Sequence, residues 1–438
     1  MVNLSTKQKV SYSMGGLALN LANLAISQWL LKLYVPNKEH ALMSSTLFAF
    51  IFLIGRLTDG ITEPLAGYWS DNCKSKWGRR MPFIIFGFIP VSIITFLLWT
   101  PPFPNEYHWL NGVYIFVIVQ MFFIAWSLLA NPYMSLLPEL TSDLKERVNI
   151  STMQAIFIMV GTLLFGVMGP IKEALGWVGI GTVLAVITMI SFIPTILTIK
   201  EKKLPAESTN KEKTSIKEIF KWAKTTFQNK AFVVLLTATS LFWFSLNLLI
   251  LIIPFWVQYY LNLTDSSVLL LMAPFLFANV VFFFVFNLLA KKYGKYKVFL
   301  LTLSGSGIML FVMCFTGTFA LGSSLLQSQI AMGLIGIFVS GFLMLPAALL
   351  ADVIDYDQSL TGMRREGIYF GMQAIFQKLS IGMSIAIATY MMYIEGGNLP
   401  TIFGLKTILV LGGISATASF LVFLKYPLRE KDGKIIFK

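Results

Sequence analysis

Residues 201–230 read EKKLPAESTNKEKTSIKEIFKWAKTTFQNK, the longest polar stretch in a chain of 438 residues. Apolar residues make up 56% of the chain and charged residues only 13%, and the mean hydropathy is +0.73. Because a soluble domain carries about 25% charged residues, this composition excludes an ordinary soluble enzyme and a secreted disulfide scaffold. Long apolar runs recur on both sides of the polar stretch, which indicates a protein with many membrane spans.

Six apolar runs precede the polar stretch and six follow it, with Pro, Gly or charged residues between them. The predicted membrane helices lie near 12–35, 42–69, 82–101, 108–138, 149–170, 176–199, 231–260, 266–290, 297–320, 326–351, 367–393 and 402–425. Two six-helix halves joined by a long charged loop are the layout of the major facilitator fold. We therefore expect an all-α membrane protein of 12 transmembrane helices, with an N-terminal half (1–199), a central loop (200–230) and a C-terminal half (231–438).

Basic residues are distributed unequally between the loops. Of the 34 lysines and arginines, 28 lie near the N-terminus, in the loops after every second span and in the C-terminal tail. Only four lie on the opposite side: Lys32, Lys38, Lys172 and Lys406. The positive-inside rule then places both termini in the cytoplasm. The net charge of +13 reflects these loops and predicts contact with the lipid bilayer, not with nucleic acid. The short loops are typical of a protein of a prokaryotic plasma (inner) membrane, and we expect a monomer.

The two halves show a weak internal repeat. GYWSDNCKSKWGRR (67–80) has a counterpart in NLLAKKYGKYK (287–297), and ANPYMSLLPEL (130–140) has one in LPAALLADVID (345–355). In the central loop, residues 215–230 could form an amphipathic helix on the membrane surface, with four side chains toward lipid: Ile216, Ile219, Phe220 and Trp222.

Four ionisable residues lie inside predicted spans, where each charge costs about 2.5–3.5 kcal/mol or more. The segment GRLTDGITEPLAG (55–67) contains Arg56, Asp59 and Glu63, and the span near 367–393 contains Lys378. Such residues are expected to pair with each other or to serve a function.

Asp59 and Glu63 are four residues apart and share one helix face. Two ionised carboxylates about 6 Å apart repel by roughly 3 kcal/mol at an effective dielectric near 20. Either one of them holds a proton or a cation lies between them. Pro64 has no N–H, so the carbonyl of Gly60 loses its helical donor, and the Thr62 hydroxyl lies nearby. These hard oxygen ligands suit Na⁺, Li⁺ or H⁺.

A structural ion-pair network is the alternative interpretation of the same charges. Arg56 lies one turn before Asp59 and could neutralise it, and Lys378 could neutralise Glu63. A transporter could also alternate between such pairing and cation binding.

Enzyme motifs are absent from the sequence. It contains no Gly-rich phosphate loop, no HExxH and no Ser/His/Asp grouping. The two cysteines and two histidines (Cys73, Cys314, His40 and His108) are too few for a disulfide framework or a zinc or haem site. We expect no cofactor and no metal other than a coupling alkali cation. Secondary transport driven by an ion gradient is the activity that remains.

Several segments, in order, resemble the glycoside–pentoside–hexuronide:cation symporters, the melibiose permease group of the major facilitator superfamily. They are SYSMGGLALN (11–20), GRLTDGITEPLAGYWSDNCKSKWGRRMP (55–82), NPYMSLLPELTSD (131–143) and ADVIDYDQ (351–358). The resemblance implies a Na⁺- or H⁺-coupled symporter. It places the family's cation-site residues at Asp59, Glu63, Thr62 and Ser127, and the lysine of its eleventh helix at Lys378.

The sugar site departs from this pattern. Where melibiose permease uses two aspartates to accept hydroxyl hydrogen bonds, this sequence has Asn20 and Ala130; Met134 replaces a tryptophan, and the family's arginine falls near Gln154. Either the sugar differs or the substrate is not a sugar. The segments GRLTDGITEPL and RRMPFIIF (79–86) also resemble sodium-coupled lysophospholipid symporters, so a lysolipid or another amphiphile is the alternative substrate.

We therefore predict cation-coupled symport of a sugar or glycoside by alternating access. The candidate substrate residues are Asn20, Asn131, Gln154, Asn247, Gln373 and Lys378. The candidate gating residues at the cytoplasmic ends of spans are Asp71, Arg79, Arg80, Asp352, Asp355, Arg364 and Arg365. Asp352 and Asp355 either are solvated or form a latch with the loop residues Arg364 and Arg365. A membrane sensor or scaffold that does not transport is the rival from another class; it would need no acid pair in the membrane.

Overall fold

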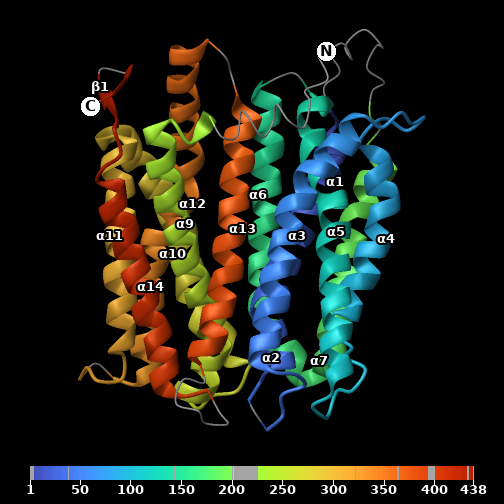
Figure 1. The fold of residues 1–438 in the computed structure, drawn as a ribbon, viewed down its shortest axis with the longest axis vertical. Coiled ribbons are helices and arrows are strands. Elements are labelled where there is room, and N and C mark those ends of the chain that lie inside the picture. Colours follow the sequence, from blue (N-terminus) through green and yellow to red (C-terminus); the bar gives the residue numbers. More distant parts are fainter. Residues whose placement is uncertain are drawn as a thin grey trace. The chain divides into compact units, whose positions relative to one another are not determined.

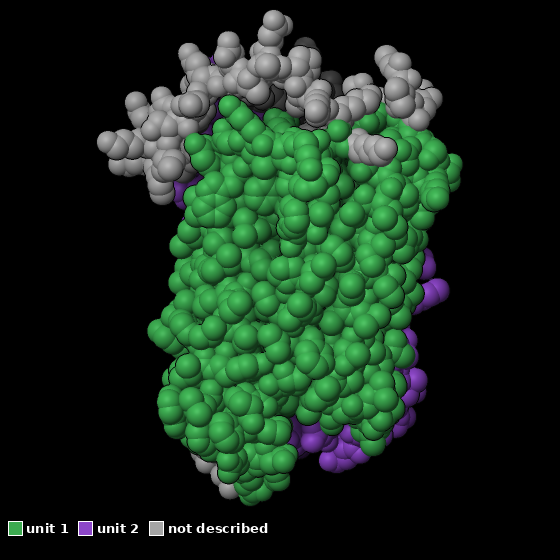
Figure 2. All heavy atoms as spheres, turned by 90° about the vertical axis from the view of Figure 1, so that its right-hand side faces the viewer, with its two compact units in different colours: residues 1–209, 264–266, 397–399 green, residues 210–263, 267–396, 400–438 purple. Residues whose placement is uncertain are grey.

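The computed structural model describes residues 4–37, 39–141, 144–199, 201, 225–320, 322–362, 365–392, 400–431 and 434–437. The chain divides into two compact units, coloured separately in Figure 2. Unit 1 contains the described residues up to 201 together with residues 264–266. Unit 2 contains the described residues from 225 onward, apart from 264–266.

The described part of unit 1 contains seven helices (Figure 1): α1 (Thr6–Ser13), α2 (Gly15–Tyr34), α3 (Ser45–Asp71), α4 (Met81–Leu97), α5 (Trp109–Leu140), α6 (Leu144–Gly166) and α7 (Met168–Thr198). Side-chain caps fix several of their starts. Ser5 and Gln8 form a capping box at α1, and the Ser44 hydroxyl accepts from the N–H of Leu47 at α3.

Unit 2 is helical in the same way: α9 (Lys230–Phe255) runs into the π-turn η2 (Trp256–Tyr260), followed by α10 (Ser267–Tyr293), α11 (Lys295–Cys314), α12 (Ser324–Thr361), α13 (Glu366–Met391) and α14 (Ile402–Phe423). A short antiparallel hairpin follows α14. Its strands β1 (Leu428–Lys431) and β2 (Lys434–Phe437) pair Leu428 with Phe437. The hairpin was not predicted, because its two strands are only four residues long.

In the described part of the chain, eleven helical segments are long and apolar enough to cross a membrane. Two of them combine neighbouring elements, α1 with α2 and α9 with η2. α4 is shorter, with 17 residues, but at 1.5 Å per residue it extends about 25 Å, most of a bilayer core of about 30 Å. Each of the twelve predicted spans thus corresponds to a helix, and the predicted all-helical fold is confirmed.

The helices pack in the same order in both units. In unit 1, α3 packs on α5, α2 packs on α6 and α7, and α4 packs on α5 and α7. In unit 2, α10 packs on α12, α9 packs on α13 and α14, and α11 packs on α12 and α14. Each helix pair in unit 1 has a counterpart in unit 2 that joins the spans at the equivalent positions. The internal repeat that the sequence shows only weakly is therefore plain in the packing.

Some helix boundaries differ from the prediction. α12 continues to Thr361, ten residues beyond the predicted end, because residues 352–361 contain no Pro or Gly; Gly362 then closes the helix in the left-handed conformation (φ 69°). α7 begins at Met168, before the predicted start at Gly176, and Gly176 (φ 68°) instead kinks the helix. α11 ends at Cys314, six residues early. The predicted amphipathic helix, with Ile216, Ile219, Phe220 and Trp222, lies outside the described residues except for its last six positions.

Candidate functional site

The predicted cation-site residues Asp59, Gly60, Thr62 and Glu63 lie on α3, the helix that packs along α5. Arg56 and Asp59 are each 4% exposed, while Thr62 and Glu63 are half-buried. Pro64 lies inside α3, so the Gly60 carbonyl has no helical N–H donor, as the sequence predicts. One helix therefore carries a buried carboxylate, a second acid one turn later and, between them, a backbone oxygen that lacks its usual i+4 donor.

A hydroxyl from α5 contacts Asp59. Ser127 Oγ donates to Asp59 Oδ1 at 3.0 Å, and Thr62 Oγ1 lies 3.0 Å from Ser127 Oγ. Thr62 also donates to the backbone oxygen of Thr58 at 2.9 Å. The tertiary structure thus brings together Asp59, Thr62 and Ser127, three of the residues that the family resemblance assigns to a cation site.

The charge of Asp59 is balanced from the same helix. Arg56 NH1 lies 3.8 Å from Asp59 Oδ2, while Arg56 NH2 donates to Ser27 Oγ on α2 at 2.8 Å. The guanidinium carbon also lies 4.9 Å from the centre of the Phe123 ring on α5, a cation–π distance. Arg56 is therefore the counter-charge to Asp59 in this structure, as the ion-pair interpretation predicts.

The candidate substrate residues of unit 1 bind to neighbouring helices. Asn20 on α2 donates to the Ile158 backbone oxygen (2.8 Å) and to Thr162 Oγ1 (2.5 Å) on α6. Asn131 on α5 donates to the backbone oxygen of Glu63. Gln154 is 5% exposed, and its amide nitrogen lies 3.5 Å from Met134 Sδ. These amides join helices by hydrogen bonds, the common role of polar groups in spans.

The other candidate substrate residues belong to unit 2. Asn247 on α9 donates to the backbone oxygen of Trp243, one turn earlier on the same helix, at 2.8 Å. Gln373 and Lys378 are half-buried on α13.

The gating candidates of unit 1 surround the turn between α3 and α4. Arg80 donates to Asp71 and to Ser70. The backbone N–H groups of Arg79, Arg80 and Met81 all donate to the carboxylate of Glu201, at 2.8, 2.8 and 3.0 Å. Glu201, just after α7, thus caps the start of α4, where a negative charge is favoured. Sequence reasoning missed Glu201, whose only signal was its place as the first acid after a span.

The gating candidates of unit 2 pair differently from the expectation. In the sequence, Asp352 and Asp355 are the acids that could form a latch with Arg364 and Arg365. The structure instead pairs Asp352 with Lys295 of α11, at 2.5 Å. Asp355 is exposed on α12, and Arg364 lies outside the described residues.

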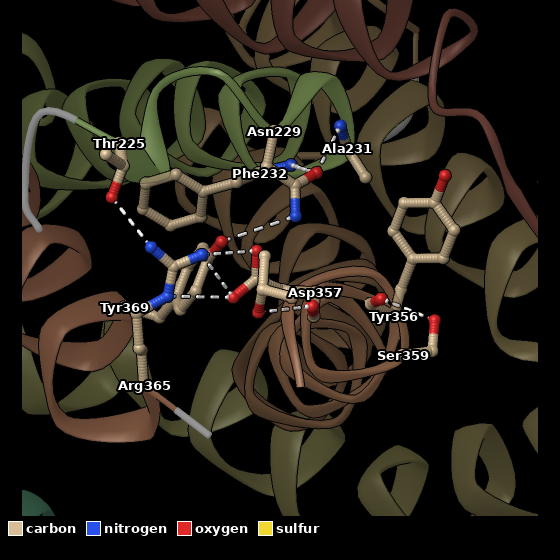
Figure 3. A network of polar contacts seen from close by, with 10 residues as sticks. Thr225, Asn229, Ala231, Phe232, Tyr356, Asp357, Ser359, Arg365 and Tyr369 are labelled. Atoms are coloured by element: carbon tan, nitrogen blue, oxygen red, sulfur yellow. Dashed lines mark hydrogen bonds and ion pairs between the residues drawn. The ribbon is translucent and has the colours of Figure 1, made fainter. Parts of the chain in front are cut away.

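Arg365 binds Asp357, which sequence reasoning had not selected (Figure 3). Arg365 NH2 donates to both carboxylate oxygens at 2.7 and 2.8 Å, and Nε donates at 3.1 Å. Arg365 NH1 donates to Thr225 Oγ1 at 2.7 Å. Asp357 follows Val353 and Ile354 by four and three residues, so the helical period already placed it on the buried face of α12.

A second buried charge cluster in unit 1 was also missed. Asp265 accepts hydrogen bonds from Lys32 at the end of α2 and from Lys172 on α7, the latter at 2.7 Å. Glu173 accepts from the N–H of Ser266 at 2.9 Å. Burial alone would raise the pKa of the Asp265 carboxyl, but the charge of Lys32 and the hydrogen bonds from both lysines lower it below its ordinary value.

Comparison with known proteins gives a consistent result. Residues 11–425 match the family described as MFS/sugar transport protein. The isoprimeverose transporter of Lactiplantibacillus pentosus is 24% identical over 395 residues, covering 87% of this chain and 78% of that protein. The putative sulfoquinovose importer of Escherichia coli (strain K12) is 23% identical, covering 87% and 80%. Lactose permease of Lactobacillus delbrueckii subsp. bulgaricus is 23% identical, covering 86% and 61%.

Solved structures share the fold. The crystal structure of a D-xylose–proton symporter superposes with a TM-score of 0.72 at 14% identity, covering 98% of this chain and 99% of that one. The nucleoside transporter NupG superposes with a TM-score of 0.70 at 10% identity, covering 97% and 99%.

Proposed function

The chain belongs to the MFS/sugar transport protein family, a family of multi-pass membrane transporters, and we propose that it is a symporter that couples a sugar or glycoside to Na⁺, Li⁺ or H⁺. In this proposal residues 1–199 and 231–438 are the two halves that alternate, joined by the loop 200–230. Both termini lie in the cytoplasm, and the protein works as a monomer in the plasma (inner) membrane.

The observation that carries the cation coupling is the environment of Asp59. Its carboxylate is buried in a membrane span, where it accepts a hydrogen bond from Ser127, whose hydroxyl also contacts that of Thr62, and lies 3.8 Å from the Arg56 guanidinium. A buried acid in a span is costly unless it is used. Carboxylate and hydroxyl oxygens are the ligands that a hard cation prefers, and Arg56 supplies the balancing charge when no cation is bound. Glu63 and the Gly60 carbonyl are the further ligands that we propose.

The names of the relatives support a sugar-type substrate, since they include transporters of isoprimeverose and lactose. We propose that the substrate contacts amides and one ammonium: Asn20, Asn131, Gln154, Asn247, Gln373 and Lys378. Because Asn20 already binds Ile158 and Thr162, substrate hydroxyls must exchange with these partners. Gating would then break the pairs Asp71–Arg80, Asp352–Lys295 and Asp357–Arg365 at the ends of the helices.

Uptake into proteoliposomes tests this proposal. A panel of labelled pentoses, glycosides, uronates and lysophospholipids would be offered under an inward Na⁺, Li⁺ or proton gradient, with K⁺ as the control. We expect uptake of a sugar-class solute that needs one of the three gradients and is lost in Asp59→Asn but kept in Glu106→Gln, a change at an exposed loop acid. Uptake that ignores every ion gradient would refute the coupling, and uptake of lysophospholipids alone would refute the sugar assignment.

A further inference from the structure

The Arg56–Asp59 pair stops short of direct contact. Both side chains are buried, but their nearest recorded nitrogen–oxygen distance is 3.8 Å, beyond the range of a hydrogen bond. Buried arginine–carboxylate pairs usually close into two parallel N–H···O bonds. Here Arg56 Nε is buried and has no hydrogen-bond partner. Something must hold the guanidinium away from the carboxylate.

Ser27 on α2 is the group that does so. Its hydroxyl accepts the NH2 proton of Arg56 at 2.8 Å, the one hydrogen bond recorded for this guanidinium among the described residues. The Phe123 ring beneath the guanidinium restrains its plane, with the guanidinium carbon 4.9 Å from the ring centre. Asp59 in turn is drawn toward α5 by Ser127. The two charges are therefore held by different neighbouring helices, α2 for the cation and α5 for the anion.

We propose that Ser27 is a positioning residue of the cation site: it holds Arg56 close enough to balance Asp59 but too far to occupy the carboxylate. This inference rests on the proposed function. A coupling cation and the guanidinium compete for the same oxygens. If the pair closed into two hydrogen bonds, the cation would first have to break them, and its affinity would fall. Ser27 itself does not contact the cation; it acts through Arg56.

Substitution of Ser27 tests the proposal, with the Na⁺ dependence of thermal stability in detergent as the readout. A ligand that binds the folded state adds stability in proportion to ln(1 + [Na⁺]/Kd), so melting temperatures across a Na⁺ titration give the Na⁺ Kd without any transport step. We expect Ser27→Ala to raise this Kd about tenfold, or about 1.4 kcal/mol. Ser27→Thr keeps the hydroxyl and should restore the wild-type Kd. Ser13→Ala is the matched control, because that buried hydroxyl donates to the backbone oxygen of Ile150 at 3.2 Å and lies on α1.

A double-mutant cycle separates positioning from a general packing effect. In an Arg56→Gln background no guanidinium competes for Asp59, so Ser27→Ala should no longer change the Na⁺ Kd. If Arg56→Gln does not fold, Arg56→Lys replaces it, and the effect of Ser27→Ala should shrink because lysine cannot form the bidentate pair.

The outcomes are distinguishable. An unchanged Na⁺ Kd in Ser27→Ala, with a wild type that responds to Na⁺ and an Asp59→Asn variant that does not, would overturn the role of Ser27 and leave the proposed function intact. An equal effect of Ser27→Ala with and without Arg56 would also overturn it. A wild-type protein that ignores Na⁺ would overturn the Na⁺ site, and the inference with it.

Discussion

Removal of the charge at Asp59 has a calculable effect on stability. Arg56 and Asp59 are both 4% exposed, and their charged atoms lie 3.8 Å apart. At an effective dielectric of about 20, two unit charges at this distance attract by about 4 kcal/mol. Asp59→Asn keeps the shape and an oxygen for Ser127, but leaves the Arg56 cation buried without its counter-charge. The loss of one partner of a buried pair typically costs about 3–5 kcal/mol, which agrees with the Coulomb value.

We expect Asp59→Asn to lower the free energy of unfolding by about 4 kcal/mol in K⁺ buffer, where no coupling cation contributes. Arg56→Gln should cost a similar amount for the same reason. The double variant restores neutrality, so it should be far more stable than the sum of the two single losses allows.

Denaturant titration of the purified protein in detergent, followed by far-UV circular dichroism, measures these differences. Glu106→Gln serves as the control for loss of an exposed acid. Strictly additive losses in the double variant would refute the reasoning, because they would show that the two charges do not interact. A stable Asp59→Asn variant would likewise show that Arg56 has another counter-charge.

Three further perturbations follow from the contacts of unit 1. Glu201→Gln removes the charge that accepts three backbone N–H bonds at the start of α4, and should lower the free energy of unfolding by about 1–3 kcal/mol in the same denaturant titration; no loss would mean that the cap contributes nothing. The pKa of Asp265 is lower in the folded than in the unfolded protein, so its contribution to stability is complete above about pH 4 and is lost as the pH falls through the folded pKa. Melting temperatures measured from pH 7 to pH 3 should therefore fall more steeply in the wild type than in Asp265→Asn; parallel curves would contradict this. Gly169→Ala would place a Cβ atom 1.9 Å from the Asp265 backbone oxygen, so it should cost about 1–3 kcal/mol, whereas Gly67→Ala, with nothing within 4 Å, should be nearly neutral in the same titration.

The amino-acid sequence by itself determined the twelve apolar helices, their division at 201–230 and the acids of α3. These features depend on composition and on the helical period, both of which are local properties of the chain. The period also showed that Asp59 and Glu63 share one face, and that Pro64 removes a donor from Gly60. α12 runs past its predicted end because a polar sequence continues the helix without a breaker.

The tertiary structure alone decided which side chains meet. Ser127 reaches Asp59 from α5, Ser27 reaches Arg56 from α2, and Glu201 reaches the turn before α4 from beyond α7. Such partners are 29 to 122 residues apart in the chain, and no local pattern records how neighbouring helices are rotated against each other. The same limit explains why Arg365 was not matched to Asp357: several acids at the end of α12 had suitable charge, but the packing of α12 buries Asp357 beside Arg365 and leaves Asp355 exposed.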